Sequence, residues 1–265
     1  MKRLFIYSNK TAQSAAAEKH SCDILRAKGF ELCSAFDESV DMILVFGGDG
    51  AFLQALEACG YPKVPVLGIN TGHLGFFQEL GPDDTELLLQ YCSGGNFALQ
   101  PYRLLRVDVE TEQGILTDYA LNDVLVKDSG AGVIKLDLSI GDNMVEKFYG
   151  DGIIVASSAG STGYNYSLKG CIVDPRLEAL QLTPCAPINN QVYRTFSSSL
   201  LFPPSLDIKV RPVKIDEGRT SVFADGREIH RGAFRQVTIA LSDRRINVVR
   251  NKDYDFWSKV QSKFL

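Results

Sequence analysis

The sequence predicts a two-part protein, with an α/β N-terminal domain on a parallel sheet and a β-rich C-terminal domain folded as a β-sandwich. In the first hundred residues, continuous apolar runs alternate with helical patterns. Such runs are typical of parallel strands that helices cover on both faces. After Pro101, short segments alternate apolar and polar residues between turns. That pattern is typical of a mainly antiparallel sandwich.

The elements of the N-terminal part follow from its apolar runs and its glycines. Gly29 and Gly60 end two helical patterns, because glycine is the usual residue just beyond a helix C-terminus. We expect strands at 4–7, 42–46 and 64–69, and helices at 12–28, 51–59 and 83–92.

The C-terminal part is expected to be mostly strands. One helix is expected within it, at 176–182, and the last stretch from Val237 onward predicts two strand-like runs and a helix at 254–264. The strands are expected at 105–109, 119–126, 134–140, 153–156 and 206–210.

Composition and charge exclude several classes of protein. Apolar residues make up 45% and charged residues 23%, as in a globular enzyme, and the net charge is −4. The sequence shows no basic stripe of the kind that binds nucleic acid, no long apolar run that could cross a membrane, and no signal-peptide core. The six cysteines are scattered without a C-x-x-C pair, which favours reduced thiols over a metal site. We therefore expect a cytoplasmic protein with no nucleic-acid or membrane partner.

A glycine-rich turn carries the first candidate chemistry. The apolar run 42–46 leads directly into Gly47-Gly48-Asp49-Gly50, and a helix follows. Ligands bind in open α/β sheets where strands end, and glycines together with a helix N-terminus suit phosphate oxygens. A carboxylate among phosphates indicates a general base or a metal partner, so Asp49 is the candidate catalytic residue. The alternative is that Asp49 only caps the helix.

Further polar strings follow later strands. The segment 68–76 contains Asn70-Thr71-Gly72-His73, which either contributes to a binding site or forms an ordinary turn. Asn122-Asp123 stands at a strand start, where an amide suits an adenine edge and a carboxylate suits a ribose diol. The segment 150–167 places a strand between Gly-Asp-Gly and a loop rich in hydroxyls and glycines. Ala224-Asp225-Gly226 is a further candidate segment, and its alternative interpretation is a plain hairpin turn.

These motifs resemble one family. Gly-Gly-Asp-Gly after a strand resembles the superfamily of NAD kinases, phosphofructokinases and diacylglycerol-type lipid kinases. The strings at 68–76 and 150–167, together with Ala186-Pro187-Ile188-Asn189, are similar to segments of the bacterial-type NAD kinases and occur in the same order. This chain departs from the usual pattern at several positions, which are Ala51, Asp123, Tyr149, Ser158, Ala159, Gly163 and Lys169.

The resemblance implies a fold, a reaction and a site. Residues 1–100 would form the nucleotide-binding domain, 101–236 the NAD-binding domain, and 237–265 would pack back on the first, with the site between them. Asp49 would bind the 2′-hydroxyl of the adenosine ribose and take its proton, and Gly47, Gly48 and Gly50 would receive the phosphates of ATP. The NAD-binding residues would be Asp49, Gly50, Phe76, Asn122, Asp123, Tyr149, Asp151, Ser158, Thr162, Gly163, Tyr164, Asn165, Tyr166, Ser167 and Ala186.

Among these, Asn122 would hold adenine and Asp123 ribose. Thr162, Tyr164 and Ser167 would form the adenosine pocket, and Asp151 would contact the nicotinamide half or fix its loop. The resemblance also implies Mg²⁺ (or another divalent metal) with ATP, and a homodimer or homotetramer whose sites borrow residues from a neighbour. No residue is assigned as a metal ligand. Two alternatives stay open at this point: a lipid kinase on the same scaffold, and a non-catalytic sensor that binds NAD(P).

Overall fold

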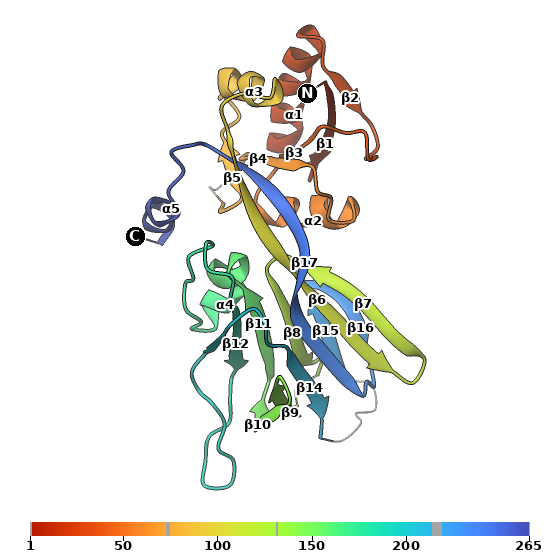
Figure 1. Cartoon of the computed structure of the whole chain (residues 1–265), viewed down its shortest axis with the longest axis vertical. Helices are drawn as coiled ribbons and strands as arrows, with labels where there is room; N and C mark the ends of the chain where they lie inside the picture. Colours follow the sequence, from red (N-terminus) through yellow and green to blue (C-terminus); the bar gives the residue numbers. More distant parts are fainter. Residues whose placement is uncertain (1, 73–74, 131, 214–218, 265) are drawn as a thin grey trace. The chain divides into compact units, whose positions relative to one another are not determined.

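The computed structural model describes residues 2–72, 75–130, 132–213 and 219–264. The chain divides into two compact units, which we call unit 1 (Met1–Tyr102 with Arg245–Leu265) and unit 2 (Arg103–Arg244). The chain leaves unit 1 along β6 (Ala98–Thr111) and returns to it along β17 (Gln236–Arg250) (Figure 1).

Unit 1 is built on a parallel sheet. Strand β1 pairs with β2 and β3, while β4 pairs with β3, β5 and the end of β17, and all these pairs are parallel. The strands are β1 (Arg3–Ser8), β2 (Glu31–Cys33), β3 (Met42–Phe46), β4 (Pro65–Ile69) and β5 (Gln78–Leu80). The helices are α1 (Ala12–Ala27), α2 (Asp49–Ala58), α3 (Thr85–Cys92) and α5 (Phe256–Phe264).

Burial of the strands explains their sequences. All five residues of β3 are fully buried, which is why the run contains no polar residue. Helix α1 begins after Thr11, whose hydroxyl accepts a hydrogen bond from the backbone N–H of Ser14 at 3.2 Å. The apolar faces of α1 and α3 join β1, β3 and β4 in one core, which includes Leu4, Leu25, Leu44, Leu67 and Leu88.

Unit 2 contains two antiparallel sheets around one core. The first sheet has the strand order β13-β12-β11-β8-β15-β16. In the second, β9 lies between β10 and β14, β14 pairs with β17, and β6 pairs with β7. The remaining strands are β7 (Gly114–Ala120), β8 (Asp123–Asp128), β9 (Ile134–Ile140), β10 (Asn143–Gly150), β11 (Gly152–Ser157), β12 (Leu180–Cys185), β13 (Leu200–Phe202), β14 (Ile208–Pro212), β15 (Thr220–Ala224) and β16 (Arg227–Arg231).

The shared core contains residues from both sheets, such as Val155 and Val222 from the first and Leu136 and Ile239 from the second. The first sheet leads into a short 3₁₀ helix, η1 (Ala159–Thr162), and a single-turn helix, α4 (Tyr164–Ser167). The parallel α/β part and the sandwich together confirm the predicted fold class.

Some predicted elements are wrong. The expected helix at 176–182 does not form, because Leu180–Cys185 is the strand β12, which pairs with β11 on one side and β13 on the other. All six of its residues are buried, whereas an amphipathic helix would expose one face. The expected strand at 119–126 is broken at Leu121 and Asn122, which separate β7 from β8. The two runs expected after Val237 are one continuous strand, β17.

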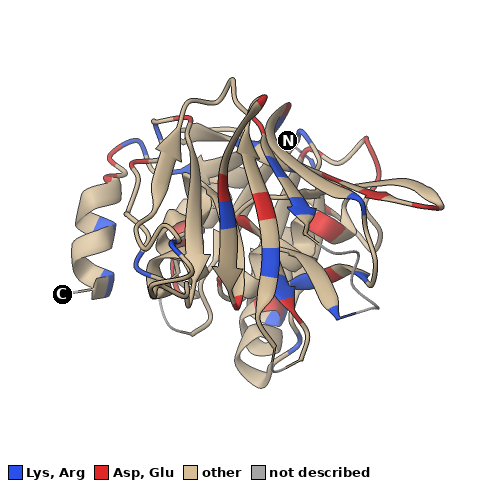
Figure 2. Ribbon diagram, turned by 90° about the horizontal axis from the view of Figure 1, so that it is seen from below, with Lys and Arg blue, Asp and Glu red and all other residues tan. Residues whose placement is uncertain are grey.

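Charged residues of both signs occur along the described part of the chain, and the cysteines are unpaired. Lys and Arg positions are interspersed with Asp and Glu along the ribbon (Figure 2). All six cysteines are free, and Cys22, Cys59, Cys92 and Cys185 are buried. Among the described helices, none has both the length and the apolar character needed to span a bilayer.

Candidate functional site

The glycine-rich turn of unit 1 joins β3 to α2. Gly47 has φ of +152°, and Gly48 is the N-cap residue of α2, so Asp49 is the first residue of the helix. Because Gly48 holds the N-cap position, the alternative that Asp49 only caps the helix is wrong. A Cβ added to Gly48 or Gly50 would meet nothing within 4 Å, so an anion has room to approach this backbone.

The Asp49 carboxylate is held by the loop that follows β4. The backbone N–H of Phe76 donates to Oδ2 and that of Phe77 donates to Oδ1, each at 3.0 Å. A Cβ on Gly75 would stand less than 3.0 Å from Asp49 Oδ1, so only glycine at position 75 allows the carboxylate to occupy this position. The Asp49 side chain remains 29% exposed, which leaves part of the carboxylate open to a substrate.

Helix α5 also reaches this carboxylate. The ammonium of Lys263 lies 3.5 Å from Asp49 Oδ2 and 4.6 Å from the centre of the Phe76 ring. The rings of Phe256 and Phe264 pack on Phe76 at 6.0 and 5.9 Å. Sequence reasoning missed Lys263, because it lies 214 residues from Asp49 and no motif surrounds it.

Unit 2 holds the second group of predicted residues at the start of β8. Asp225 lies in the two-residue turn between β15 and β16, where it has φ of +48° and Gly226 has φ of +78°. Positive φ at both positions is the geometry of a type I′ hairpin. The Asp225 carboxylate accepts the backbone N–H of Leu121 at 2.7 Å, of Asn122 at 2.7 Å and of Asp123 at 3.2 Å. Asp225 is therefore both a hairpin residue and the anchor of the Asn122-Asp123 segment, and the sequence indicated only the first role.

Asn122 has an amide oxygen that is left unsatisfied by the described residues. Its Oδ1 is buried and has no hydrogen-bond partner among the described residues. A Cβ on Gly160 would lie within 3.0 Å of the Asn122 backbone, so η1 approaches the residue before β8 as closely as glycine permits. The unpartnered amide oxygen supports a role in binding a donor such as an adenine amino group.

Burial and nearby charges shift the pKa values of Asp123, Asp225 and Tyr164 in unit 2. Asp123 is 8% exposed, and burial followed by the nearby Asp225 carboxylate raises its pKa to about 7. Burial likewise raises the pKa of Asp225 to about 6, against its three backbone hydrogen bonds and Arg227, which lower it. The pKa of the Tyr164 hydroxyl is raised by burial and then by Cys185, Asp123 and Asp151. The surroundings of the Tyr164 hydroxyl thus include both the Asp123 and the Asp151 carboxylates.

The loop at 157–167 contains two kinds of residue: some are buried and hydrogen-bonded within the protein, and others are exposed to solvent. Asn165 is fully buried, and its Oδ1 accepts the Thr183 hydroxyl at 2.7 Å. Ser158 is also buried, and its hydroxyl donates to the Leu177 carbonyl. Tyr164 is 51% exposed and Tyr166 41% exposed. Of the other predicted residues here, Ser167 is exposed, and Thr162 and Gly163 are half-buried.

Tyr149 and Ala186 lie near the start of β11, at the opposite end of this strand from the loop at 157–167. The Tyr149 ring packs on Tyr193 with 4.2 Å between centroids, and the backbone N–H of Ile188 donates to the Tyr149 carbonyl at 2.8 Å. Ala186 is exposed and has φ of +44°. Asp151 is also exposed, and its backbone N–H donates to the Cys185 carbonyl at 3.0 Å.

The remaining predicted string, 68–76, is only partly described. His73 and Leu74 lie outside the described residues. Asn70 forms a local turn, since its Nδ2 donates to the Gly72 carbonyl at 2.9 Å, and Thr71 hydrogen-bonds to Ser14 at 2.6 Å.

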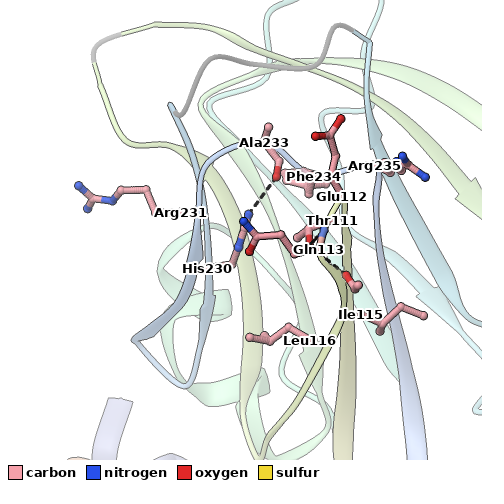
Figure 3. Close-up of a pocket in the computed structure, with 11 residues that line it drawn as sticks. Thr111, Glu112, Gln113, Ile115, Leu116, His230, Arg231, Ala233, Phe234 and Arg235 are labelled. Atoms are coloured by element: carbon pink, nitrogen blue, oxygen red, sulfur yellow. Dashed lines mark hydrogen bonds between the residues drawn. The ribbon is translucent and has the colours of Figure 1, made fainter.

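A surface pocket of unit 2 lies away from all these residues. It is lined by the β6–β7 turn and the end of β16, including Thr111, Leu116, His230 and Phe234 (Figure 3). His230 Nε2 lies 3.3 Å from the Ala233 carbonyl oxygen, and none of the predicted site residues lines the pocket. Within the described part of the chain, no group of three or more His, Cys, Asp or Glu side chains could hold a metal ion.

Comparison with known proteins gives matches over both units. Residues 6–97 match the family model of the ATP-NAD kinase N-terminal domain, and residues 121–251 match that of the ATP-NAD kinase C-terminal domain. The NAD kinase of Finegoldia magna is 35% identical over 265 residues, covering 98% of this chain and 97% of that protein. NAD kinase 1 of Listeria monocytogenes is 34% identical over 233 residues, covering 86% and 87%.

Solved structures agree with these sequence matches. An NAD kinase from Archaeoglobus fulgidus in complex with ATP superposes with a TM-score of 0.75 at 26% identity, covering 99% of both chains. Yeast NADH kinase complexed with NADH gives a TM-score of 0.87 at 18% identity, covering 99% of this chain and 87% of that one. At that identity the second match supports the fold alone.

Proposed function

This chain belongs to the NAD kinase family, and from that premise we propose that it transfers the γ-phosphoryl group of ATP to the 2′-hydroxyl of the adenosine ribose of NAD, giving NADP. The observation that carries the mechanism is the Asp49 carboxylate, which two backbone N–H groups orient directly after the glycine-rich turn. An oriented, partly exposed carboxylate at this place is suited to bind a hydroxyl and to accept its proton.

We assign the phosphates of ATP to residues 47–50. Here the backbone of Gly48 and Gly50 is unobstructed, and the N-terminus of α2 offers N–H groups and a positive dipole end. Phosphoryl transfer depends mainly on positioning and on stabilising charge, so few catalytic side chains are required. Mg²⁺ would enter with ATP, since this ion is usually bound through substrate phosphates with few protein ligands.

We assign the adenosine half of NAD to the start of β8 and to α4. Support comes from the unpartnered Asn122 Oδ1 and from Tyr164, the pKa of whose hydroxyl is raised by burial and by carboxylates that include Asp123. The exposed Tyr164 ring gives a flat face for a base. Ser158 and Asn165 are buried and bonded within the protein, so we assign them to holding this loop in shape.

We also propose that the protein is cytoplasmic and forms a homodimer or a homotetramer. A reduced, cytosolic environment is consistent with the free thiols of all six cysteines. A homodimer or homotetramer is supported by exposed apolar side chains of unit 2, which include Met144, Val192 and Phe196. Light scattering coupled to gel filtration would measure the mass directly, and a monomer at micromolar concentration would contradict the assembly.

The function is tested by incubating the protein with NAD, ATP and Mg²⁺ and detecting NADP with an NADP-specific dehydrogenase. Parallel reactions replace NAD with NADH or with diacylglycerol vesicles. We expect NADP formation from NAD and no phosphorylated lipid. A protein that binds NAD in calorimetry but forms no NADP would instead be a sensor.

A further inference from the structure

The cation nearest to Asp49 comes from the opposite end of the chain. Lys263 stands on the last turn of α5, with its ammonium 3.5 Å from Asp49 Oδ2. The ammonium of Lys263 also lies over the Phe76 ring, and the N–H of Phe76 donates to the same carboxylate oxygen. One residue of unit 1 therefore supports both the carboxylate and the cation.

Packing fixes this end of α5. Phe256 and Phe264 both contact Phe76, so the first and last turns of the helix are anchored on the loop that follows β4 and holds the Asp49 carboxylate. Between them, Lys259 donates a hydrogen bond to the Gln78 carbonyl oxygen. Because three side chains of α5 hold it against residues 76–78, the place of Lys263 follows from the fold rather than from a single ion pair.

The glycine-rich turn has no cation of its own. The segment from Met42 to Cys59 contains neither lysine nor arginine, and neither does the segment from Gly75 to Leu80. Transferring a phosphoryl group requires positive charge on the oxygens that gain negative charge. Lys259 is committed to the Gln78 carbonyl, and burial lowers its pKa to about 8. Lys263 is 30% exposed and faces the proposed base.

We propose that Lys263 is a catalytic residue that pairs with Asp49 in the free protein and donates to the transferring phosphoryl group when ATP and NAD are bound. This inference rests on the proposed function. The 2′-oxygen forms a bond to Pγ while the bond from Pγ to the bridging oxygen of ADP breaks, and the hydroxyl proton passes to Asp49. Lys263 exchanges only its hydrogen-bond partner. Its release from Asp49 is favoured as the carboxylate loses its charge to that proton.

Three variants test the role of Lys263. Lys263→Met keeps an unbranched side chain and removes the charge, whereas Lys263→Arg keeps the charge. Lys252→Met is the matched control, since Lys252 is an exposed lysine of the same C-terminal segment. Each full-length variant is assayed for NADP formation, NAD affinity by calorimetry and thermal unfolding.

We expect Lys263→Met to lower kcat at least about tenfold, with NAD affinity changed less than about threefold. Loss of one buried transition-state donor typically costs ~10²–10³-fold, and Lys263 is partly exposed, so the effect should lie at or below that range. Lys263→Arg should recover most of kcat, and Lys252→Met should equal wild type.

Two results would overturn the proposal. An unchanged or higher kcat in Lys263→Met would mean that the ion pair only stabilises α5 or keeps Asp49 from acting as a base. A fall in NAD affinity equal to the fall in kcat would make Lys263 a binding residue with no part in the transfer. If wild type itself forms no NADP, the proposed function fails rather than this inference.

Discussion

Asp49 shows how backbone geometry prepares one side chain for chemistry. Both carboxylate oxygens accept a backbone N–H from the loop after β4, so the group cannot rotate freely. A fixed carboxylate loses little entropy when it meets a substrate hydroxyl, which is the advantage of a preorganised site.

Asp49→Asn should lower turnover by ~10²–10⁴-fold, which is the usual contribution of a general base. The amide has one acceptor oxygen, so one of the N–H groups of Phe76 and Phe77 loses its partner, and stability should fall by about 1–3 kcal/mol. Steady-state kinetics and denaturant unfolding measure the two effects. A variant that keeps more than half of the wild-type turnover would rule out the base role.

Tyr164→Ala should weaken NAD binding by roughly 1–3 kcal/mol, the scale of one base–aromatic stack. The ring is 51% exposed, so its removal should leave the free energy of unfolding nearly unchanged. Calorimetry with NAD measures the affinity. Leu201→Ala, which removes an exposed apolar side chain from β13 of the same unit, is the control, and equal losses in both variants would argue against a specific stack.

The buried pair Asp123 and Asp225 predicts a dependence of stability on pH. The pKa of Asp123 is about 7 in the folded chain, against ~3.9 in an unfolded chain. Between these values the folded state holds a proton that the unfolded state has released, so stability falls as pH rises from about 4 to 7 and then levels off. Asp225, with a pKa of about 6, acts in the same direction.

Asp123→Asn should therefore lose less stability than wild type between pH 5 and pH 7, because the amide does not titrate. Urea unfolding at pH 5, 6, 7 and 8 gives the comparison. Parallel curves for the two proteins across this window would show that Asp123 titrates at its ordinary pKa.

At the scale of elements, the second group of site residues depends on the contact between β8 and η1. Gly160 brings η1 against the Asn122 backbone, and Asp225 holds the same segment from the β15–β16 turn. Two elements that are distant in sequence thus set the position of Asn122 and Asp123.

Gly160→Ala should destabilise the protein by about 1–3 kcal/mol, as overpacking does, because its Cβ would overlap the Asn122 backbone. Gly163→Ala is the matched control, since its Cβ would meet the Gly160 carbonyl oxygen at an ordinary 3.4 Å. Thermal unfolding compares the two, and equal unfolding temperatures would contradict the close contact.

The predictions from sequence succeeded where local pattern decides the structure. The apolar run 42–46 and the glycines after it placed β3 and the turn that carries Asp49. They failed where tertiary pairing decides, as in Leu180–Cys185, which is a strand because β11 and β13 flank it. The side chain contacts of Lys263 and Asp225 could not be predicted, because they join elements far apart in the chain.

At the scale of the whole molecule, each unit supplies one part of the proposed reaction. Unit 1 carries Asp49 and the glycine-rich turn, and unit 2 carries Asn122, Asp123 and Tyr164. The family models match residues 6–97 and 121–251, so both units carry domains of the NAD kinase family.

The central claim is that the whole chain phosphorylates NAD at the 2′-position of the adenosine ribose. The most direct measurement is ³¹P NMR of the product formed from NAD, ATP and Mg²⁺, together with its oxidation state and its acceptance by an NADP-specific dehydrogenase. We predict one new phosphomonoester signal that coincides with authentic NADP and is lost in Asp49→Asn. A product phosphorylated elsewhere, or ATP consumed with no phosphorylated NAD, would contradict the account.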